Sequence, residues 1–170
     1  MKFIDLAQAR YSVRSFADKQ VEPEKLQRIL EAGRVAPTAK NNQPQYIYVL
    51  QGETAAKAAE ISPCTYNAPV VMIVCYDKDQ VATLPEMNDV NFGYVDTAIV
   101  ITHMMLQASA LGLGSCWIGC FHDKQTRELF DIPDNLEIAA LLDIGYPDEK
   151  GQPADRHTER KTLDETVKFI

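Results

Sequence analysis

The order of elements along this 170-residue sequence predicts a single α/β or α+β domain. Two kinds of segment alternate: apolar runs typical of strands, and segments whose apolar residues recur every three or four positions, as they do in helices. One helical segment, residues 92–111, is much longer than the others. The length suits one domain, and no repeat or linker divides the sequence.

The first two helices are defined by apolar spacing and by proline. Residues 3–9 form a short amphipathic segment that ends just before a basic stretch. Residues 24–34 carry apolar side chains at helical spacing, with Pro23 at the beginning and Pro37 beyond the end. We therefore expect a helix in each segment.

A loop, a strand, a helix and a second strand follow. Residues 37–44 are polar and bracketed by prolines, which favours a loop. Residues 46–50 are rich in β-forming side chains, whereas residues 54–61 are rich in alanine and are expected to be helical. The nearly continuous apolar run at residues 69–76 indicates a central strand covered on both faces.

The second half of the sequence begins with the long helix. Residues 92–111 keep a helical apolar period over about five turns, and Gly112 supplies a C-terminal stop. Residues 115–121 and 138–144 are expected to be two further buried strands, with a helix at residues 123–130 between them. The long helix is therefore expected to be the spine of the domain.

Composition excludes several classes of partner. The net charge of −7 and the pI near 4.9 repel phosphate backbones, so we expect no nucleic acid. The most apolar stretch, residues 94–113, contains Asp96, His103 and other polar side chains, so we expect no membrane span. The N-terminus lacks the apolar core of a signal peptide, and a cytoplasmic location is expected.

The cysteines and histidines do not suggest a metal centre. Cys64, Cys75, Cys116 and Cys120 lack the paired spacing of a zinc site and the density of a secreted disulfide scaffold. We expect reduced, mostly buried thiols. His103 lies within the apolar helix and is interpreted as a core or interface histidine rather than a ligand.

Alternating basic residues follow the first helix. In an extended segment Arg10, Ser12 and Arg14 point to the same side. Two guanidinium groups and a hydroxyl suit a phosphate, because arginine forms bidentate charge-assisted hydrogen bonds. The alternative is a solvated segment whose charges bind nothing.

Two other segments have the composition of a binding surface. Residues 37–44 concentrate side chains that donate and accept hydrogen bonds, as the edge of a planar heterocycle and a polyol would require; the alternative is a capped turn. Residues 112–119 contain three glycines, which admit a flat group against the backbone or merely end a helix. Neither segment carries a phosphate-loop motif.

Together these segments resemble the FMN-dependent nitroreductase family, in that family's order and over nearly the whole sequence. The matching motifs are Arg10-x-Ser12-x-Arg14-x-Phe16, Ala36-Pro37-Thr38-x-x-Asn41-x-Gln43-Pro44, Gly112-x-Gly114-x-Cys116-Trp117-Ile118-Gly119 and Ile144-Gly145-Tyr146-Pro147.

The resemblance implies an α+β homodimer with a central mixed β-sheet flanked by helices and the long helix at the dimer interface. It also implies two sites for non-covalent FMN between the subunits, each formed from both chains. Arg10 and Ser12 would hold the phosphate or ribityl chain, and Arg14 would reach the pyrimidine edge. Trp117 is otherwise interpreted as a core or dimer-contact aromatic.

The expected cofactor-binding residues are Arg10, Tyr11, Ser12, Arg14, Pro37, Thr38, Ala39, Asn41, Gln43, Cys116, Trp117, Ile118, Gly119, Arg160 and Lys161. Arg160 and Lys161 stand where the family has a basic pair that closes on the phosphate, and Arg156 is the alternative for this contact.

The function implied by the resemblance is that of an oxidoreductase. NADH or NADPH would reduce FMN and leave, and a nitroaromatic, quinone or similar small acceptor would then take the electrons. Because the flavin carries the chemistry, no catalytic side chain is expected. The alternatives are a non-catalytic FMN carrier or sensor, and a shared fold with an empty site.

Overall fold

The computed structural model describes residues 2–84, 86 and 90–170. Its α-helices are α1 (Phe3–Ala9), α2 (Pro23–Arg34), α3 (Glu53–Lys57), α4 (Phe92–Ala110), α5 (Asp123–Phe130) and α6 (Leu163–Thr166). Its strands are β1 (Gln45–Gln51), β2 (Val70–Asp77), β3 (Gly114–Ile118) and β4 (Leu136–Gly145). Three short 3₁₀ turns complete the described elements: η1 (Ala39–Asn41), η2 (Ala58–Glu60) and η3 (Asp155–Thr158).

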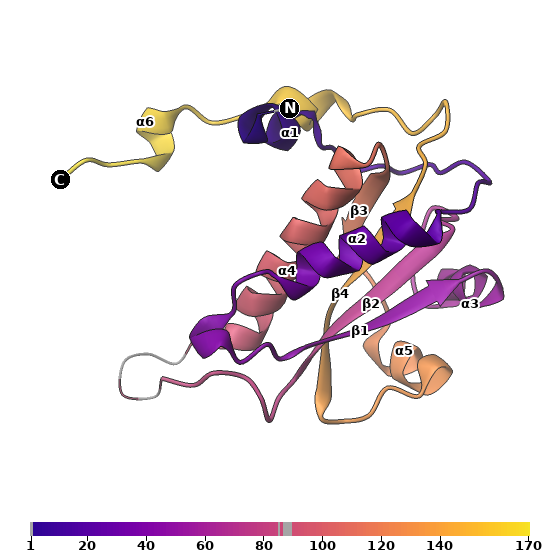
Figure 1. Ribbon diagram of the computed structural model, residues 1–170, viewed down its shortest axis with the longest axis horizontal. Helices are drawn as coiled ribbons and strands as arrows, with labels where there is room; N and C mark the ends of the chain where they lie inside the picture. Colours follow the sequence, from indigo (N-terminus) through magenta and orange to yellow (C-terminus); the bar gives the residue numbers. More distant parts are fainter. Residues whose placement is uncertain (1, 85, 87–89) are drawn as a thin grey trace.

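The four strands form one sheet in the order β1-β2-β4-β3, and every neighbouring pair is antiparallel (Figure 1). The expected α+β class and helix-flanked sheet are confirmed. The expectation of a mixed sheet is wrong for these four strands, which are all antiparallel. Among the described residues, parallel pairing is confined to the isolated bridge between Ser12 and Ser115.

Helices cover both faces of the sheet. On one face α2 and α4 pack against Met72, Val74 and Leu142, all fully buried. On the other face α3, η2 and the end of α5 pack against Ile73 and Leu141. The central strand β2 is buried along nearly its whole length, as its continuous apolar sequence predicts.

The predicted helices and strands are confirmed within a few residues, except for the end of β3. The expected strand at residues 115–121 stops at Ile118. Beyond it the backbone bonds to a different segment: Cys120 O accepts from Ser62 Oγ at 2.6 Å, and His122 N donates to Ile61 O at 2.9 Å. These contacts turn the chain away from β4 and end the strand.

The position of α4 is fixed by close packing at its first turn and along its buried face. Asn91 Oδ1 caps the helix by accepting from Gly93 N at 2.9 Å. A Cβ atom on Gly93 would lie 2.4 Å from the Tyr76 ring, and one on Gly33 of α2 would lie 3.0 Å from Met104. The helix therefore has little freedom to shift against the sheet or against α2.

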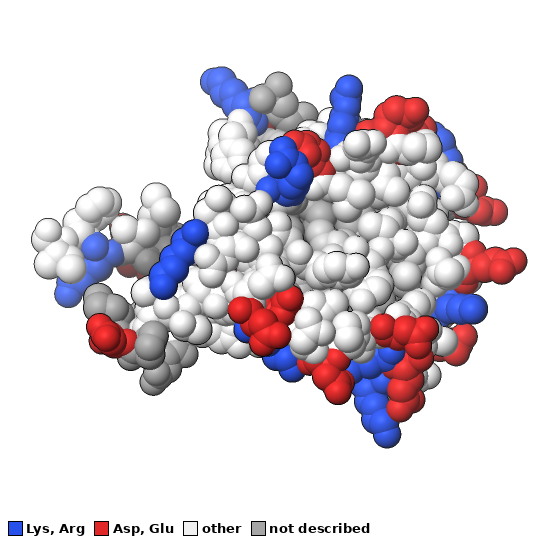
Figure 2. All heavy atoms as spheres, turned by 60° about the horizontal axis from the view of Figure 1, so that its bottom comes forward, with Lys and Arg blue, Asp and Glu red and all other residues white. Residues whose placement is uncertain are grey.

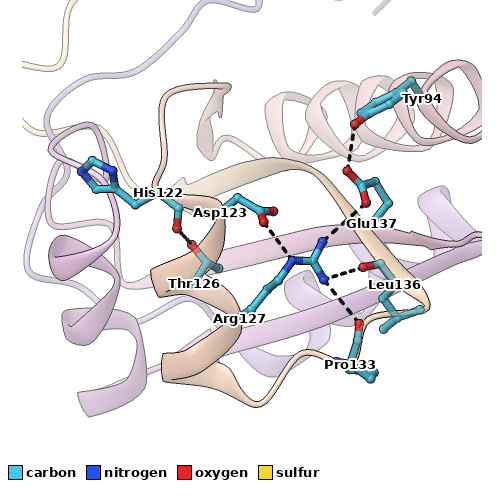
Figure 3. A network of polar contacts seen from close by, with 8 residues as sticks. All are labelled: Tyr94, His122, Asp123, Thr126, Arg127, Pro133, Leu136 and Glu137. Carbon is cyan, nitrogen blue, oxygen red and sulfur yellow. Dashed lines mark hydrogen bonds and ion pairs between the residues drawn. The ribbon is translucent and has the colours of Figure 1, made fainter.

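A polar network ties the beginning of α4 to α5 and β4 (Figure 3). Arg127 Nε donates to Asp123 Oδ2 at 2.9 Å, and Arg127 Nη1 donates to Leu136 O at 2.7 Å. Glu137 pairs with the same guanidinium and accepts from the Tyr94 hydroxyl at 3.2 Å. Partial desolvation, and next the neighbouring Tyr76 and Glu137, raise the pKa of Tyr94 to about 12, so the hydroxyl keeps its proton and donates.

The surface mixes charges of both signs. Figure 2 shows one face that is largely uncharged, with acidic and basic side chains both present and mostly toward its rim. None of the helices in the described ranges is long and apolar enough to cross a bilayer.

Asp143 is an unusual member of the core. It lies in β4, in register with Cys116 of β3 and Val71 of β2, and is fully buried. Neither of its carboxyl oxygens accepts a hydrogen bond from the described residues. Burial raises the pKa of Asp143 to about 9, so the side chain is a neutral acid at pH 7.

We predict that Asp143 makes the fold less stable as the pH rises. The pKa of Asp143 in the folded protein lies above the unfolded value of 3.8. Its protonated side chain therefore contributes fully to the free energy of unfolding below pH 4, and this contribution is lost progressively up to about pH 9. Between these limits the free energy of unfolding falls by at most about 1.4 kcal/mol per pH unit. Urea unfolding of the apoprotein at pH 5, 7 and 8.5 should therefore show a flatter pH dependence for Asp143→Asn. Parallel pH profiles for the two proteins would contradict this account.

Candidate functional site

The basic N-terminal segment is fixed against β3. Val13 is buried, and its N–H donates to Ser115 O at 2.9 Å. Arg10 and Ser12 are half-buried, and Arg14 is exposed. Because Val13 is buried, its neighbours Ser12 and Arg14 lie on the other side of this extended segment, where Arg14 is exposed.

Gly114 allows this close contact. A Cβ atom at Gly114 would lie 2.4 Å from Val13 Cγ2, so a side chain here would push the basic segment off β3. Gly112 has a different role: with φ of +74° it ends α4 in the left-handed region. Gly114 thus lets the segment that carries Arg10 lie against β3.

The end of β3 presents backbone to the outside. Cys116 and Ile118 are buried, whereas the Trp117 side chain is 37% exposed. Gly119 is exposed, and a Cβ there would meet nothing within 4 Å, so the backbone is open to a flat group. Burial, and next the neighbouring Asp143, raise the pKa of Cys116 to about 11, which makes it an inert thiol.

The polar loop at residues 37–44 is held in a defined conformation by hydrogen bonds. Ala39 N donates to Asp96 Oδ1 of α4 at 2.9 Å, and Gln43 N donates to Thr38 Oγ1 at 3.0 Å. Gln43 Nε2 also reaches Asn41 O at 3.1 Å, so the loop satisfies part of its own backbone. Three of its residues lie in the left-handed region: Lys40, Asn41 and Gln43.

The C-terminal segment runs beside the N-terminal one. His157 Nε2 lies 3.0 Å from Gln8 O, and the His157 ring meets the Tyr11 ring edge-on at 5.9 Å. Figure 1 shows η3, in yellow, against α1. Arg160 and Lys161 follow this contact and are exposed, with Arg160 Nη1 donating to Glu159 O at 2.6 Å.

The structure separates the predicted residues into two groups at opposite ends of α4. Arg10 and Tyr11 border a small cavity with Ser109, near the C-terminal end of the helix. Ala39 is bound to Asp96, near its N-terminal end. The 13 residue-to-residue steps from Asp96 to Ser109 span about 20 Å of helix axis. One chain therefore does not bring the two groups together.

Sequence reasoning missed two residues that shape these surfaces: His157, which holds the C-terminal segment beside Tyr11, and Asp96, which binds the loop. Asp96 left a signal, as an acidic side chain within an otherwise apolar helical stretch. The contact of His157 depends on tertiary packing. Gly114 belongs to the glycine motif that the sequence indicated, and the group that packs against it is Val13.

The outer face of α4 is apolar and exposed in the described part of the chain. Tyr94 and Val95 are 47% and 43% exposed, and they line a shallow hollow with Ile99 and His103. His103 Nδ1 lies 2.8 Å from Ile99 O, so this histidine bonds within the helix. A neighbouring groove between α1, α2 and α4 extends the apolar surface to Phe3, which is 70% exposed.

Comparison with known proteins places this geometry in a family. The model of the nitroreductase family matches residues 7–66 and 57–146. A protein of Archaeoglobus fulgidus named as a putative NADH dehydrogenase/NAD(P)H nitroreductase is 32% identical over 152 residues, with 83% of each chain covered.

Two solved structures from Clostridium difficile share the fold. A nitroreductase family protein superposes with a TM-score of 0.91 and 42% identity, covering 99% of this chain and 98% of its own. A protein described as an FMN-dependent nitroreductase gives a TM-score of 0.77 and 29% identity, with 98% of each chain covered. The family match and these identities show that this chain belongs to the nitroreductase family.

Proposed function

We propose that this chain is an NAD(P)H-dependent FMN oxidoreductase that reduces small electrophilic acceptors, such as nitroaromatics or quinones, in two half-reactions. The whole chain would act as one FMN-binding domain. The relatives named as NAD(P)H nitroreductase and FMN-dependent nitroreductase support this chemistry. The observation that carries the proposal is the basic segment fixed to β3, the strand that ends just before the open backbone of Gly119.

The residues present fit FMN. Arg10 and Ser12 offer a guanidinium and a hydroxyl to a phosphate or ribityl chain, and their backbone is already fixed by the bond between Val13 and Ser115. The exposed Arg14 supplies a cation for the electron-rich pyrimidine edge. Arg160 and Lys161 lie on the segment that His157 holds beside Tyr11 and would add positive charge.

The polar loop and the end of β3 would line the ring and ribityl chain. Pro37, Thr38, Ala39, Asn41 and Gln43 belong to the polar loop. Cys116, Trp117, Ile118 and Gly119 would contribute backbone beside the reactive face, since Cys116 and Ile118 bury their side chains. Bound FMN supplies hydride-transfer chemistry, so the chain's own task is positioning and electrostatics.

We further propose a homodimer in which α4 of one protomer meets its partner. Each flavin would then contact the basic segment of one chain and the polar loop of the other, because α4 holds these groups about 20 Å apart within a chain. The exposed apolar face of α4 supports this arrangement, since such surfaces usually mark contacts between proteins. We expect the dimer to reside in the cytoplasm.

The first prediction is that the purified protein is yellow, with a flavin spectrum, and that anaerobic stopped-flow mixing with NADH or NADPH bleaches it within seconds. A nitroaromatic or quinone should then restore the colour. Flavin that binds but never bleaches would favour a carrier or sensor. A colourless protein that also ignores added FMN would reject both functions.

The second prediction concerns the phosphate contact. Arg10→Ala should weaken FMN binding by about 1.5 to 3 kcal/mol, because a charge-assisted hydrogen bond is lost. Fluorescence titration of the apoprotein with FMN measures the change. Lys124→Ala, which removes an exposed basic side chain from α5, is the matched control and should bind FMN as wild type does. Unchanged affinity in Arg10→Ala would remove Arg10 from the site.

The third prediction concerns the dimer. Val95→Lys places a charge on the apolar face of α4 and should convert the protein to a monomer that binds FMN poorly. Sedimentation velocity at micromolar concentration, with Gln125→Lys at an exposed position on α5 as the charge control, measures the oligomeric state. A flavin-loaded monomer in the wild type would contradict the shared site.

A further inference from the structure

Asp96 is an acidic residue buried inside the fold where a solvent-facing side chain would be expected. It is 1% exposed, and Asp143 is the other acidic residue that is buried among the described residues. Its Oδ1 accepts the N–H of Ala39 at 2.9 Å. Its Oδ2 is also buried and accepts nothing from the described part of the chain. Burial of a carboxyl group is costly, so this one bond to the loop stands out.

The loop that Asp96 binds has a conformation that needs support. Lys40, Asn41 and Gln43 have φ of 54°, 56° and 52°, in a region that residues with a side chain occupy only when their surroundings impose it. The other side-chain ties from the loop to distant segments are at the surface: Lys40 Nζ reaches Thr83 O, and Asn42 Nδ2 reaches Gln80 O. At the end of the loop, Pro44 O accepts the Asp77 N–H at 2.8 Å. The bond to Asp96 joins the first residue of η1 to the buried side of α4.

Asp96 is itself held rigidly. It lies in the second turn of α4, just after Gly93, which packs on the Tyr76 ring, and Tyr94, which donates to Glu137 (Figure 3). Because α4 is fixed against the core, the hydrogen bond from Ala39 to Asp96 also fixes this part of the loop relative to the core. In Figure 1 the turn η1 lies beside the first turns of α4.

We propose that Asp96 is a positioning residue for FMN binding: by accepting the Ala39 N–H, it holds the loop in the conformation in which Thr38, Asn41 and Gln43 can contact the flavin. The inference rests on the proposed function, because it assumes that this loop meets FMN. A loop that samples other conformations binds with an affinity reduced by the fraction of time spent in the competent one.

The test removes the bond from either side. Asp96→Ala removes the acceptor. Ala39→Pro removes the donor without obvious strain, because Ala39 is the first residue of η1 and Thr38 before it is extended. Each should weaken FMN binding by about 10- to 100-fold in fluorescence titrations of the apoprotein. The double variant should lose no more than either single one, because both act through the same bond.

Two controls separate positioning from general stability. Asp96→Asn keeps an acceptor oxygen and should restore most of the affinity. Thr97→Val changes the adjacent buried residue, whose hydroxyl bonds within α4, and should bind FMN as wild type. Hydrogen exchange in the apoprotein gives a readout without flavin: the Ala39 and Gln43 amides should lose protection in Asp96→Ala while β2 amides keep theirs.

The outcomes distinguish the two proposals. Wild-type protein that binds no FMN would reject the proposed function. Wild-type protein that binds FMN, with Asp96→Ala and Ala39→Pro binding equally tightly, would overturn the role of Asp96 alone. Additive losses in the double variant would also overturn it, since the two residues would then act separately. If Asp96→Ala does not fold, Ala39→Pro and Asp96→Asn still decide the question.

Discussion

The rigid placement of α4 is the constraint on which the rest of the structure depends. The helix is buried against the sheet through residues such as Val100 and Ile101, and Gly33 lets α2 approach Met104 closely. Its 19 residues span about 28 Å, so whatever is fixed at its two ends stays apart. One end binds the polar loop through Asp96, and the other borders the basic segment near Ser109.

This separation gives the proposed dimer a physical reason. A flavin that needs both the basic segment and the polar loop would be served by two chains packed through the outer face of α4. That face carries exposed Tyr94 and Val95. The same helix would thus hold the basic segment and the polar loop of one chain apart and supply the surface that joins two chains.

Much of the fold could be predicted from the sequence, because apolar period, proline and glycine act locally. Residues 92–111 follow the observed α4 closely, and the apolar run at residues 69–76 becomes the buried strand β2. The end of β3 could not be predicted, because the backbone beyond Ile118 forms hydrogen bonds with Ser62 and Ile61, which are distant in sequence. The antiparallel order of the sheet likewise depends on long-range pairing.

The candidate site, too, could be predicted only in part. Residue types identified the basic segment and the polar loop, and the family resemblance assigned both to FMN. The sequence did not indicate that Lys40, Asn41 and Gln43 adopt left-handed conformations, since these depend on contacts to other segments. Nor did it distinguish the two buried acids: Asp143 accepts no hydrogen bond from the described residues, whereas Asp96 binds a loop backbone.

The most direct test of the shared site is complementation between two defective chains. An Arg10→Ala chain and an Asn41→Ala/Gln43→Ala chain, co-expressed with different tags and purified as a heterodimer, should regain one intact site per dimer. The other site would carry both defects. Titration should therefore find tight FMN binding at half the wild-type stoichiometry. If the heterodimer binds no better than either mutant homodimer, each site lies within one chain and the account is wrong.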